Sequence, residues 1–444
     1  MYGLYRKITK NSTPLLLRLL DKRCENGKED QSRVDEKKAI ITKNRPAGQL
    51  IWLHAASIGE AQSALILIDR LLADNPKIHI LITTITRTSA QMMEQKLPQQ
   101  AFHQFCPLDH PDWVETFLDH WEPDIALWME SELWPNILMA LQNRKIPAVL
   151  VNAKLSTKSF GLWRLAKPLA RQTLSAFTKI LTQTEKDKTR FNALCDVPVM
   201  VTDNIKYSAH PLPCDKVDLK KVTVATTDRP IWLFASTHKG EEEMACRIHQ
   251  VLKNTLPDLL TIIVPRHPER RGKILEDCEH YQLNIRLRTQ NKDLPQDGDD
   301  IYIADTLGEL GLFYRLSPIA CIGRTFSDDG GGGHNPIEAA QLGCCVLHGP
   351  NVQYLQEIFD DMDIQGASLH MSHESHMTGT LLELLTERTK RESLLEKSLT
   401  FSRTKAQVID AVMEQLTPLV QEVLAQGSGL SAYEGNDNIA VVSA

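Results

Sequence analysis

The stretch that decides the fold occurs twice, as Ile51-Trp52-Leu53-His54-Ala55-Ala56-Ser57-Ile58-Gly59-Glu60 and as Ile231-Trp232-Leu233-Phe234-Ala235-Ser236-Thr237-His238-Lys239-Gly240-Glu241. Each copy is a short apolar run followed by small residues, a Gly-Glu pair and a pattern typical of a helix. In the first copy, that pattern covers residues 64–72, with leucine and isoleucine on one face. The repeat predicts two similar domains, each beginning with a buried strand that leads into a helix.

Short apolar runs recur along both halves of the chain at the spacing of alternating strands and helices. Amphipathic segments separate the runs, which favours parallel sheets covered by helices on both faces. The runs lie at 78–84, 125–129, 148–152, 179–183 and 199–202 in the first half and at 259–264, 302–304, 319–322 and 344–348 in the second. The predicted fold class is therefore α/β, with two domains built on parallel sheets.

The composition is that of a globular protein with several domains. The chain has 444 residues, of which 42% are apolar and 24% charged, so two or three domains of roughly 100–200 residues are expected. A formal net charge of −6 argues against nucleic acid as a partner bound through bulk positive charge. The nine cysteines show no Cys-x-x-Cys spacing, which predicts reduced thiols and no structural zinc site.

The first 23 residues mix leucine, isoleucine and tyrosine with lysine and arginine. No run reaches the roughly 18 apolar residues that a membrane-spanning helix needs. The pattern predicts a basic amphipathic helix that lies on an anionic membrane surface. The alternative is an ordinary helix packed on its own domain.

Composition divides the chain into four parts. Residues 1–23 form the amphipathic segment, residues 24–209 the first domain and residues 210–427 the second. The boundary is the segment His210-Pro211-Leu212-Pro213, in which two prolines make a stiff connector. Residues 428–444 are small and polar, so a flexible tail is expected there.

Candidate catalytic residues of the first domain lie in loops after strands, where ligands of parallel α/β sheets bind. Glu60 fits a general base toward a hydroxyl, and the alternative is an acid that complements a helix dipole. Glu130 and Glu132 directly follow the run at 125–129. One of them could orient a polar acceptor substrate or hold a cationic partner, and the alternative is that both are acidic residues at the start of a helix. Lys206 fits the stabilisation of a developing anion, and the alternative is a surface lysine.

Pro265-Arg266-His267 follows the second strand of the second domain. The flanking prolines hold two cationic side chains in a rigid loop that suits a phosphate. The alternative is a structural turn with exposed charges.

Four glycines at 330–333 precede His334 and the segment Asn335-Pro336-Ile337-Glu338. Glycine lets the backbone approach a ligand closely, and Asn335 is expected to cap a helix whose first residue is Pro336. The exposed N–H groups would then bind an anion, and Glu338 would accept hydrogen bonds from ribose hydroxyls. The alternative is a flexible solvent loop. Leu307-Gly308-Glu309 belongs to a second turn of the same kind.

Taken together, the motifs resemble the 3-deoxy-D-manno-octulosonic acid (Kdo) transferase family over roughly residues 50–420. The motifs that carry the resemblance occur in this order: Trp52 to Glu60, Glu130-Ser131-Glu132-Leu133-Trp134-Pro135-Asn136, Asn152-Ala153-Lys154-Leu155-Ser156, Asn204-Ile205-Lys206, Ala235-Ser236-Thr237-His238, Pro265-Arg266-His267-Pro268-Glu269-Arg270, Gly308-Glu309-Leu310 and Gly332-Gly333-His334-Asn335-Pro336.

The resemblance implies a GT-B glycosyltransferase, with two Rossmann-like domains that face a central cleft. It implies CMP-Kdo as the donor, a lipid A precursor (lipid IVA) as the acceptor, and inversion at the anomeric carbon without a metal ion or other cofactor. It also implies a protein of the cell inner membrane, peripheral or anchored at the cytoplasmic face, that acts in lipopolysaccharide biosynthesis.

The resemblance also implies roles for individual residues. Glu60 matches the proton acceptor of the family, and Glu130 and Lys206 match positions that stabilise the transition state. The residues that match the CMP-binding segments are Pro265, Arg266, His267, Leu307, Gly308, Glu309, Asn335, Pro336, Ile337 and Glu338.

The chain departs from the family pattern at two places near these motifs. Asp203 stands where the family has glycine, and Ser327-Asp328-Asp329 replaces a more apolar stretch before the glycines. Two carboxylates beside an anion site are unfavourable unless they point outward.

Two other readings stay open. One is a related GT-B enzyme with a different nucleotide-sugar donor, such as a UDP-sugar transferase or an epimerase. The other is a catalytically inactive scaffold or lipid-binding protein, against which the presence of Glu60, Lys206 and Arg266 argues.

Overall fold

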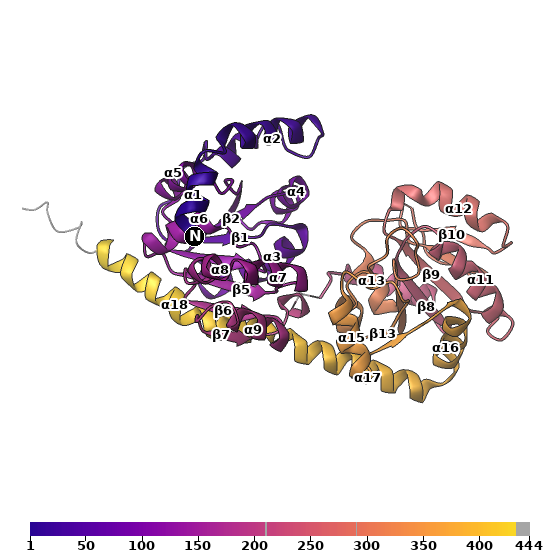
Figure 1. The fold of residues 1–444 in the computed structure, drawn as a ribbon. Coiled ribbons are helices and arrows are strands. Elements are labelled where there is room, and N and C mark those ends of the chain that lie inside the picture. The colour runs from indigo at the N-terminus through magenta and orange to yellow at the C-terminus, as the bar shows by residue number, and fades with distance from the viewer. Residues whose placement is uncertain (209–210, 290, 432–444) are drawn as a thin grey trace, which may run out of the picture. The chain divides into compact units, whose positions relative to one another are not determined.

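The computed structural model describes residues 1–208, 211–289 and 291–431, which form two compact units (Figure 1). The first unit contains residues 1–208 and 407–431, and the second contains residues 211–406 apart from the undescribed residue 290. Each unit is built on a seven-stranded sheet whose strands all pair in parallel. The predicted α/β class with two parallel-sheet domains is confirmed.

The first repeat forms the central strand of the first sheet, whose order is β3-β2-β1-β4-β5-β6-β7. All five residues of β1 are buried, as are those of its neighbour β4, which explains their continuous apolar sequences. The strands are β1 (Leu50–His54), β2 (His79–Thr84), β3 (Ala101–Phe105), β4 (Ile125–Met129), β5 (Ala148–Ala153), β6 (Lys179–Thr182) and β7 (Val199–Val201).

Helices connect the strands of the first unit, and Ser57 caps α3 by accepting a hydrogen bond from the backbone N–H of Glu60. The α-helices are α1 (Tyr2–Lys10), α2 (Thr13–Glu25), α3 (Ile58–Asp74), α4 (Arg87–Lys96), α5 (Pro111–Trp121), α6 (Pro135–Asn143), α7 (Thr157–Leu165), α8 (Lys167–Leu174), α9 (Glu185–Asn192) and α18 (Val408–Ser431). Two 3₁₀ helices cover Val34–Lys38 and Ile205–Ser208.

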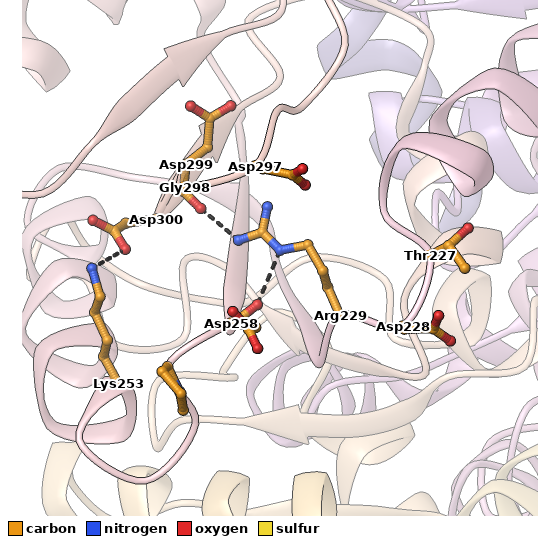
Figure 2. Close-up of a pocket in the computed structure, with 10 residues that line it drawn as sticks. Thr227, Asp228, Arg229, Lys253, Asp258, Asp297, Gly298, Asp299 and Asp300 are labelled. Atoms are coloured by element: carbon orange, nitrogen blue, oxygen red, sulfur yellow. Dashed lines mark hydrogen bonds and ion pairs between the residues drawn. The ribbon is translucent and has the colours of Figure 1, made fainter.

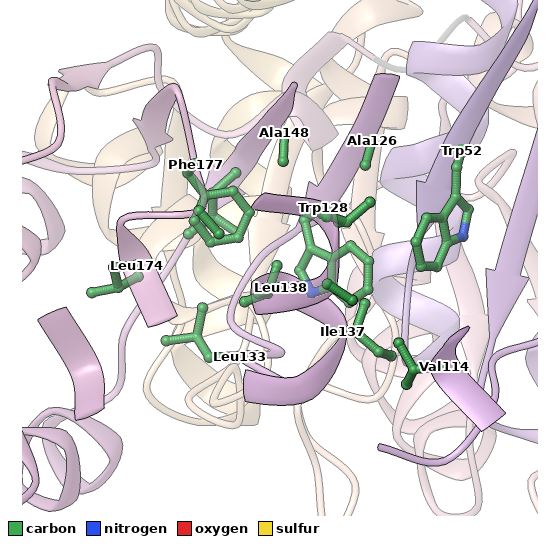
Figure 3. Packing of buried hydrophobic residues seen from close by; sticks show 14 of the residues in the cluster. Trp52, Val114, Ala126, Trp128, Leu133, Ile137, Leu138, Ala148, Leu174 and Phe177 are labelled. Atoms are coloured by element: carbon green, nitrogen blue, oxygen red, sulfur yellow. The ribbon is translucent and has the colours of Figure 1, made fainter. Parts of the chain in front are cut away.

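Tryptophans dominate the core on one face of the first sheet (Figure 3). Trp52 and Trp128 meet edge to face with ring centroids 5.2 Å apart, and Trp52 also packs on Phe117 at 4.8 Å. The buried indole N–H of Trp52 donates to Thr83 Oγ1 at 2.9 Å, so the ring loses no hydrogen bond on burial. Replacing such a residue by alanine typically costs about 3–5 kcal/mol.

The second repeat likewise forms the central strand of its sheet, whose order is β10-β11-β9-β8-β12-β13-β14. The strands are β8 (Ile231–Thr237), β9 (Leu260–Pro265), β10 (Ile285–Leu287), β11 (Ile301–Ile303), β12 (Ile319–Ile322), β13 (Cys345–His348) and β14 (Ser368–His370). The helices are α10 (Lys216–Ala225), α11 (Glu241–Lys253), a 3₁₀ turn at Pro268–Arg270, α12 (Arg271–Glu279), α13 (Leu310–Leu316), α14 (Ile337–Gln341), α15 (Gln356–Ile364), α16 (Glu374–Thr386) and α17 (Arg388–Ala406).

The last helix, α18, belongs to the first unit, so the predicted second domain of residues 210–427 is too long by its last twenty or so residues. Gln49 Nε2 donates to the carbonyl of Leu424 at 2.8 Å, and Lys179 Nζ donates to that of Gln415 at 3.1 Å. The apolar residues of α18, among them Val412 and Leu416, are buried. The helix runs on to Ser431 and so takes up residues 428–431 of the predicted tail, while residues 432–444 lie outside the described part of the chain.

The amino-terminal segment forms two helices, of which α1 docks on its own domain. Tyr5 Oη donates to Asp109 Oδ2 at 2.8 Å, and Asn136 Nδ2 donates to Thr9 Oγ1 at 2.9 Å. Apolar side chains nevertheless remain exposed on both helices: Leu4, Ile8, Leu15, Leu17 and Leu19. Within the described residues, no helix combines the length and the apolar character that a bilayer crossing requires.

Candidate functional site

Left-handed backbone conformations mark the carboxyl edge of both sheets. Glu130, Asn152 and Asp203 have positive φ angles at the ends of β4, β5 and β7, and Ser236 and Arg324 do so at the ends of β8 and β12. A non-glycine residue in this region costs on the order of 1–3 kcal/mol and is over-represented at functional sites. These residues lie at the edge that the loop positions predicted, although positive φ angles also occur before strands, as at Glu122 and Asp228.

The Glu60 carboxylate is 7% exposed and is held at the start of α3. The backbone N–H of Ala56 donates to Glu60 Oε2, and the Ser57 hydroxyl donates to Oε1, both at 2.9 Å. Burial and the nearby negative charge of Glu130 raise the pKa of Glu60 to about 7, although the two hydrogen bonds act to lower it. A carboxylate with this pKa is suited to accept a proton near neutral pH.

Glu130 and Lys206 form an ion pair beside Glu60, with Lys206 Nζ 3.6 Å from Glu130 Oε1. A Cβ added to Gly59 would lie 3.4 Å from Lys206 Nζ, so the ammonium sits close above the start of α3. Both side chains of the pair are partly exposed and available to a ligand. The structure thus brings together the three predicted catalytic residues, whose roles stay predictions.

Asn152 holds the short helix that carries Lys206. Asn152 is fully buried, and its Oδ1 accepts a hydrogen bond from the backbone N–H of Ile205 at 3.0 Å. The backbone N–H of Lys206 donates to Asn204 Oδ1 at 3.1 Å. These contacts give the Asn152 and Asn204 motifs a physical reason, which the sequence alone did not supply.

In the second unit, the predicted phosphate loop follows β9, where Arg266 and His267 are exposed. Pro265 is the last residue of the strand, and the backbone N–H of Arg266 donates to the carbonyl of Thr237 at 3.0 Å. Among the described residues, no side-chain hydrogen bond or ion pair engages the Arg266 guanidinium. Its five N–H donors are therefore available to an anion.

The glycine loop packs tightly, which corrects the alternative of a flexible solvent loop. A Cβ on Gly332 would lie 1.8 Å from Tyr354 Cδ2, and one on Gly331 would lie 2.8 Å from Asn351 Cβ. All four glycines have positive φ angles, which disfavours larger residues at each, and at Gly331 and Gly332 the lack of space excludes them as well.

The helix after the glycine loop is shorter than expected. It begins at Ile337, one residue later than predicted, with Pro336 as its N-cap, and it has only five residues. Asn335 Oδ1 still accepts a hydrogen bond from the backbone N–H of Ile337 at 3.1 Å, as a capping side chain would. Glu338 lies in the first turn and is partly buried. A helix of this length adds little dipole, so the predicted anion binding rests on the free N–H groups and nearby cations.

The Glu309 carboxylate binds protein groups rather than presenting itself to a ligand. Arg288, which is fully buried, donates to both of its oxygens at 2.7 and 2.9 Å. Burial alone would raise the pKa of Glu309, but the hydrogen bonds from Arg288 and Thr306 lower it to about 2. Gly308 and Glu309 line a cavity of about 410 Å³, and Leu307 is 79% exposed.

Sequence reasoning missed a group of polar residues at the same edge of the second sheet. His238 Nδ1 lies 2.6 Å from Asp329 Oδ2, and His238 Nε2 lies 3.1 Å from His334 Nε2. Arg324 Nε donates to Asp329 Oδ1 at 3.3 Å. Asp329 therefore pairs with cationic and imidazole groups, although its side chain, like that of Asp328, is exposed. His238 stands in the second repeat directly after β8, which was the available signal.

A cavity of about 250 Å³ lies at the opposite, amino-terminal edge of the second sheet (Figure 2). Its lining residues precede β8, β9 and β11, and Arg229 bonds there to the carbonyls of Asp258 and Asp299 at 3.0 and 2.5 Å. Ligands of such sheets bind at the carboxyl edge, so this cavity is not the candidate site. Within the described residues, no group of three or more His, Cys, Asp or Glu is placed to hold a metal ion.

Comparisons with known proteins agree with this architecture. Residues 32–209 match the family model described as 3-deoxy-D-manno-octulosonic-acid transferase (kdotransferase). The chain is 34% identical over 419 residues to a 3-deoxy-D-manno-octulosonic acid transferase of Rickettsia bellii, covering 94% of this chain and 99% of the relative. It is 33% identical to the enzyme of the same name from Haemophilus influenzae, covering 79% of this chain and 82% of the relative.

A solved UDP-GlcNAc 2-epimerase from Neisseria meningitidis resembles the chain in fold alone, at 16% identity and a TM-score of 0.53, covering 83% of this chain and 100% of the epimerase. That likeness identifies the two sheets as domains of the GT-B type. With relatives this similar over nearly its whole length, the chain belongs to the Kdo transferase family of glycosyltransferases.

Proposed function

We propose that the protein transfers Kdo from CMP-Kdo to a hydroxyl of a lipid A precursor, lipid IVA, with Glu60 as the general base. The observation that carries this proposal is the Glu60 carboxylate, buried at the carboxyl edge of the first sheet with a pKa near 7 and flanked by the Glu130–Lys206 pair. Family membership supports the donor and the lipid class of the acceptor.

The reaction is a single displacement. The acceptor hydroxyl oxygen attacks the anomeric carbon of Kdo, and its proton passes to Glu60. The bond from that carbon to the phosphate oxygen breaks, and CMP leaves with the electron pair. One displacement inverts the anomeric configuration, because no sugar–enzyme bond forms in between.

Charged groups of the first unit serve this step. Lys206 is placed to stabilise negative charge that builds in the transition state, and Glu130 holds its ammonium in position. In the second unit, Arg266 offers its free guanidinium to the CMP phosphate. The scheme uses no metal ion or other cofactor.

The test is mass spectrometry of the product made from CMP-Kdo and a tetraacylated lipid IVA disaccharide. We expect a mass increase of one or more Kdo residues, and no product under conditions of proven folding would overturn the proposal. A thermal-shift comparison of CMP with UDP tests the donor. Stronger stabilisation by UDP would favour a UDP-sugar enzyme of the same fold.

We further propose that the protein sits on the cytoplasmic face of the inner membrane through α1 and α2. The exposed leucines and isoleucine of these helices lie among lysines and arginines, as in segments that bind the headgroup layer of an anionic leaflet. Because α1 also packs on its own domain, the test should replace exposed residues rather than delete the segment.

The experiment measures binding of the full chain to vesicles that contain an anionic lipid. We expect the double variant Leu15→Ser, Leu19→Ser to bind several-fold more weakly, and added salt to weaken the wild type. The control is Ile364→Ser, an equally simple loss of an exposed apolar side chain in the second unit. Equal binding by the double variant would show that α2 is not the contact.

A further inference from the structure

Asp329 joins the two loops that follow β8 and β12 in the second unit. Its Oδ2 meets Nδ1 of His238, which follows β8, and its Oδ1 accepts from Arg324 Nε, which follows β12. The backbone N–H of Gly331 also donates to Oδ1, at 3.3 Å. The glycine loop that contains Gly331 is fixed by close packing against residues 351–354, so the position of His334 just after it is fixed as well.

These contacts determine which nitrogen of each imidazole carries its proton. An ionised Asp329 only accepts hydrogen bonds, so His238 must donate Nδ1–H to it, which leaves Nε2 of His238 as an acceptor. His334 must then donate Nε2–H across the 3.1 Å contact. As a result, Nδ1 of His334 keeps a lone pair, and among the described residues no group donates to it.

Both imidazoles are neutral at physiological pH. Burial, together with the neighbouring His238, Arg266 and Arg324, lowers the pKa of His334 to about 3. Burial also lowers the pKa of His238, although Asp329 opposes this effect. An acceptor nitrogen repels phosphate and carboxylate oxygens, which carry no proton, and it pairs with an O–H or N–H donor.

We propose that Nδ1 of His334 accepts a hydrogen bond from a hydroxyl group of the sugar nucleotide, and that Asp329 is a positioning residue for this contact. Through its hydrogen bond with His238, Asp329 keeps the proton of His334 on Nε2 and so leaves Nδ1 as an acceptor. Arg266 then remains for the anionic phosphate. The identity of the nucleotide rests on the proposed function. The assignment of protons to the ring nitrogens of His238 and His334 does not.

The order of the protons is tested by long-range ¹H–¹⁵N NMR on the full chain with labelled histidine at pH 7.5. We expect a proton on Nδ1 of His238 and on Nε2 of His334. In Asp329→Asn, Arg324 and Gly331 keep the side-chain oxygen at the Oδ1 position, so the amide N–H faces His238. His238 then accepts at Nδ1 and donates from Nε2, so both hydrogen bonds reverse their direction. His334 then carries its proton on Nδ1.

The matched control is Asp328→Asn. It removes the same charge from the neighbouring residue, whose side chain is exposed. We expect its histidine signals to match those of the wild type. A wild-type His334 protonated at Nδ1, or signals unchanged in Asp329→Asn, would overturn the positioning role, and a merely structural role for Asp329 would not reverse the protonation of His334.

Binding of CMP, 2′-deoxy-CMP and CMP-Kdo tests the ligand. We expect His334→Phe to bind CMP-Kdo about tenfold more weakly, Asp329→Asn several-fold more weakly and Asp328→Asn within twofold of wild type. His334→Gln, whose amide oxygen can accept, should restore much of the loss. Thermal unfolding of each variant shows that it is folded.

The three ligands separate the possible hydroxyl sources. If His334→Phe loses affinity for CMP-Kdo alone, the hydroxyl lies on the Kdo sugar. If it loses affinity for CMP-Kdo and CMP but not for 2′-deoxy-CMP, the hydroxyl lies on the ribose. Unchanged CMP-Kdo binding by a folded His334→Phe variant would overturn the proposal. A wild type that binds none of the three would instead refute the proposed function, while the NMR result would stand by itself.

Discussion

Glu60 and Glu241 occupy the same place in the two repeats, directly after glycine, and yet the structure uses them differently. Both are buried, and burial raises the pKa of each to about 7. Glu60 accepts one backbone N–H and one serine hydroxyl and lies beside Glu130. Glu241 accepts only backbone N–H groups, those of His238, Arg324 and Phe326.

The difference shows that a shared motif and a shared pKa do not fix a role. Glu241 is 1% exposed, and its three donors tie the loops after β8 and β12 together. Glu60 is 7% exposed and has the Lys206 ammonium nearby. We therefore expect Glu60 to matter for the reaction and Glu241 for the stability of the second unit.

The largest expected effect is that of Glu60→Gln on transfer. Glutamine keeps contacts to Ala56 and Ser57 but cannot take a proton, so we expect the rate to fall at least about a hundredfold. The measurement is a single-turnover rate with CMP-Kdo and lipid IVA, with the melting temperature as the control for folding. Transfer at a near-normal rate would remove Glu60 from the mechanism and with it the contrast to Glu241.

Glu241→Gln should act on stability instead. In the wild type, the carboxylate accepts every backbone N–H that faces it. In the variant, the amide N–H₂ cannot accept, so at least one buried backbone N–H loses its partner, which costs about 1–3 kcal/mol. Urea unfolding at pH 6 measures this loss, and we expect the transfer rate of the folded variant to stay within a few-fold of wild type. A hundredfold slower rate at unchanged stability would break the comparison.

Glu130→Gln should sharpen the comparison through the pH profile. In the wild type, log(kcat/KM) should rise with pH until Glu60 has lost its proton, near pH 7. Removing the negative charge of Glu130 lowers the pKa of Glu60, so the rise should move to lower pH. Glu132→Gln is the control and should shift the profile less, because Glu132 is the weakest contributor to this pKa. A shift to higher pH, or none, would contradict this account.

The smallest expected effect is a change in how stability depends on pH. The folded-state pKa of Glu241 is raised from 4.5 to about 7, so its contribution to stability is fully present below about pH 4.5 and is lost as pH rises through about 7. We expect the difference in unfolding free energy between wild type and Glu241→Gln to be smaller at pH 8 than at pH 5. A difference that is constant with pH would show that this carboxyl titrates normally in the folded protein.

The sequence predicted central strands well and edge strands poorly. The runs at 125–129 and 319–322 coincide with β4 and β12, which are buried over their whole length. The three missed strands, β3, β10 and β14, all lie at sheet edges. β10 and β14 are short and partly exposed, and β3 contains the buried polar residues His103 and Gln104, so none of the three has a continuous apolar run.

The candidate site could be predicted where the signal lay in one loop and not where it depended on partners far along the chain. Glu60, Glu130 and Lys206 each follow a strand, which is a local feature. The contact between His238 and Asp329 joins residues 91 positions apart, and nothing in the sequence pattern indicated that the buried Arg288 pairs with Glu309. Such pairings depend on strand order, which the sequence pattern does not specify.

The return of α18 to the first unit has a consequence for biosynthesis. A ribosome makes the seven strands of the first unit early, but α18, which packs on α3 and on the 3₁₀ helix Ile205–Ser208, emerges only after residues 211–406, so the surface beneath α18 is uncovered until then. At typical elongation rates of roughly 5–20 residues per second, that surface waits about 10–40 s for its cover. The nascent chain is therefore most exposed to aggregation and to chaperone capture during the synthesis of its second half.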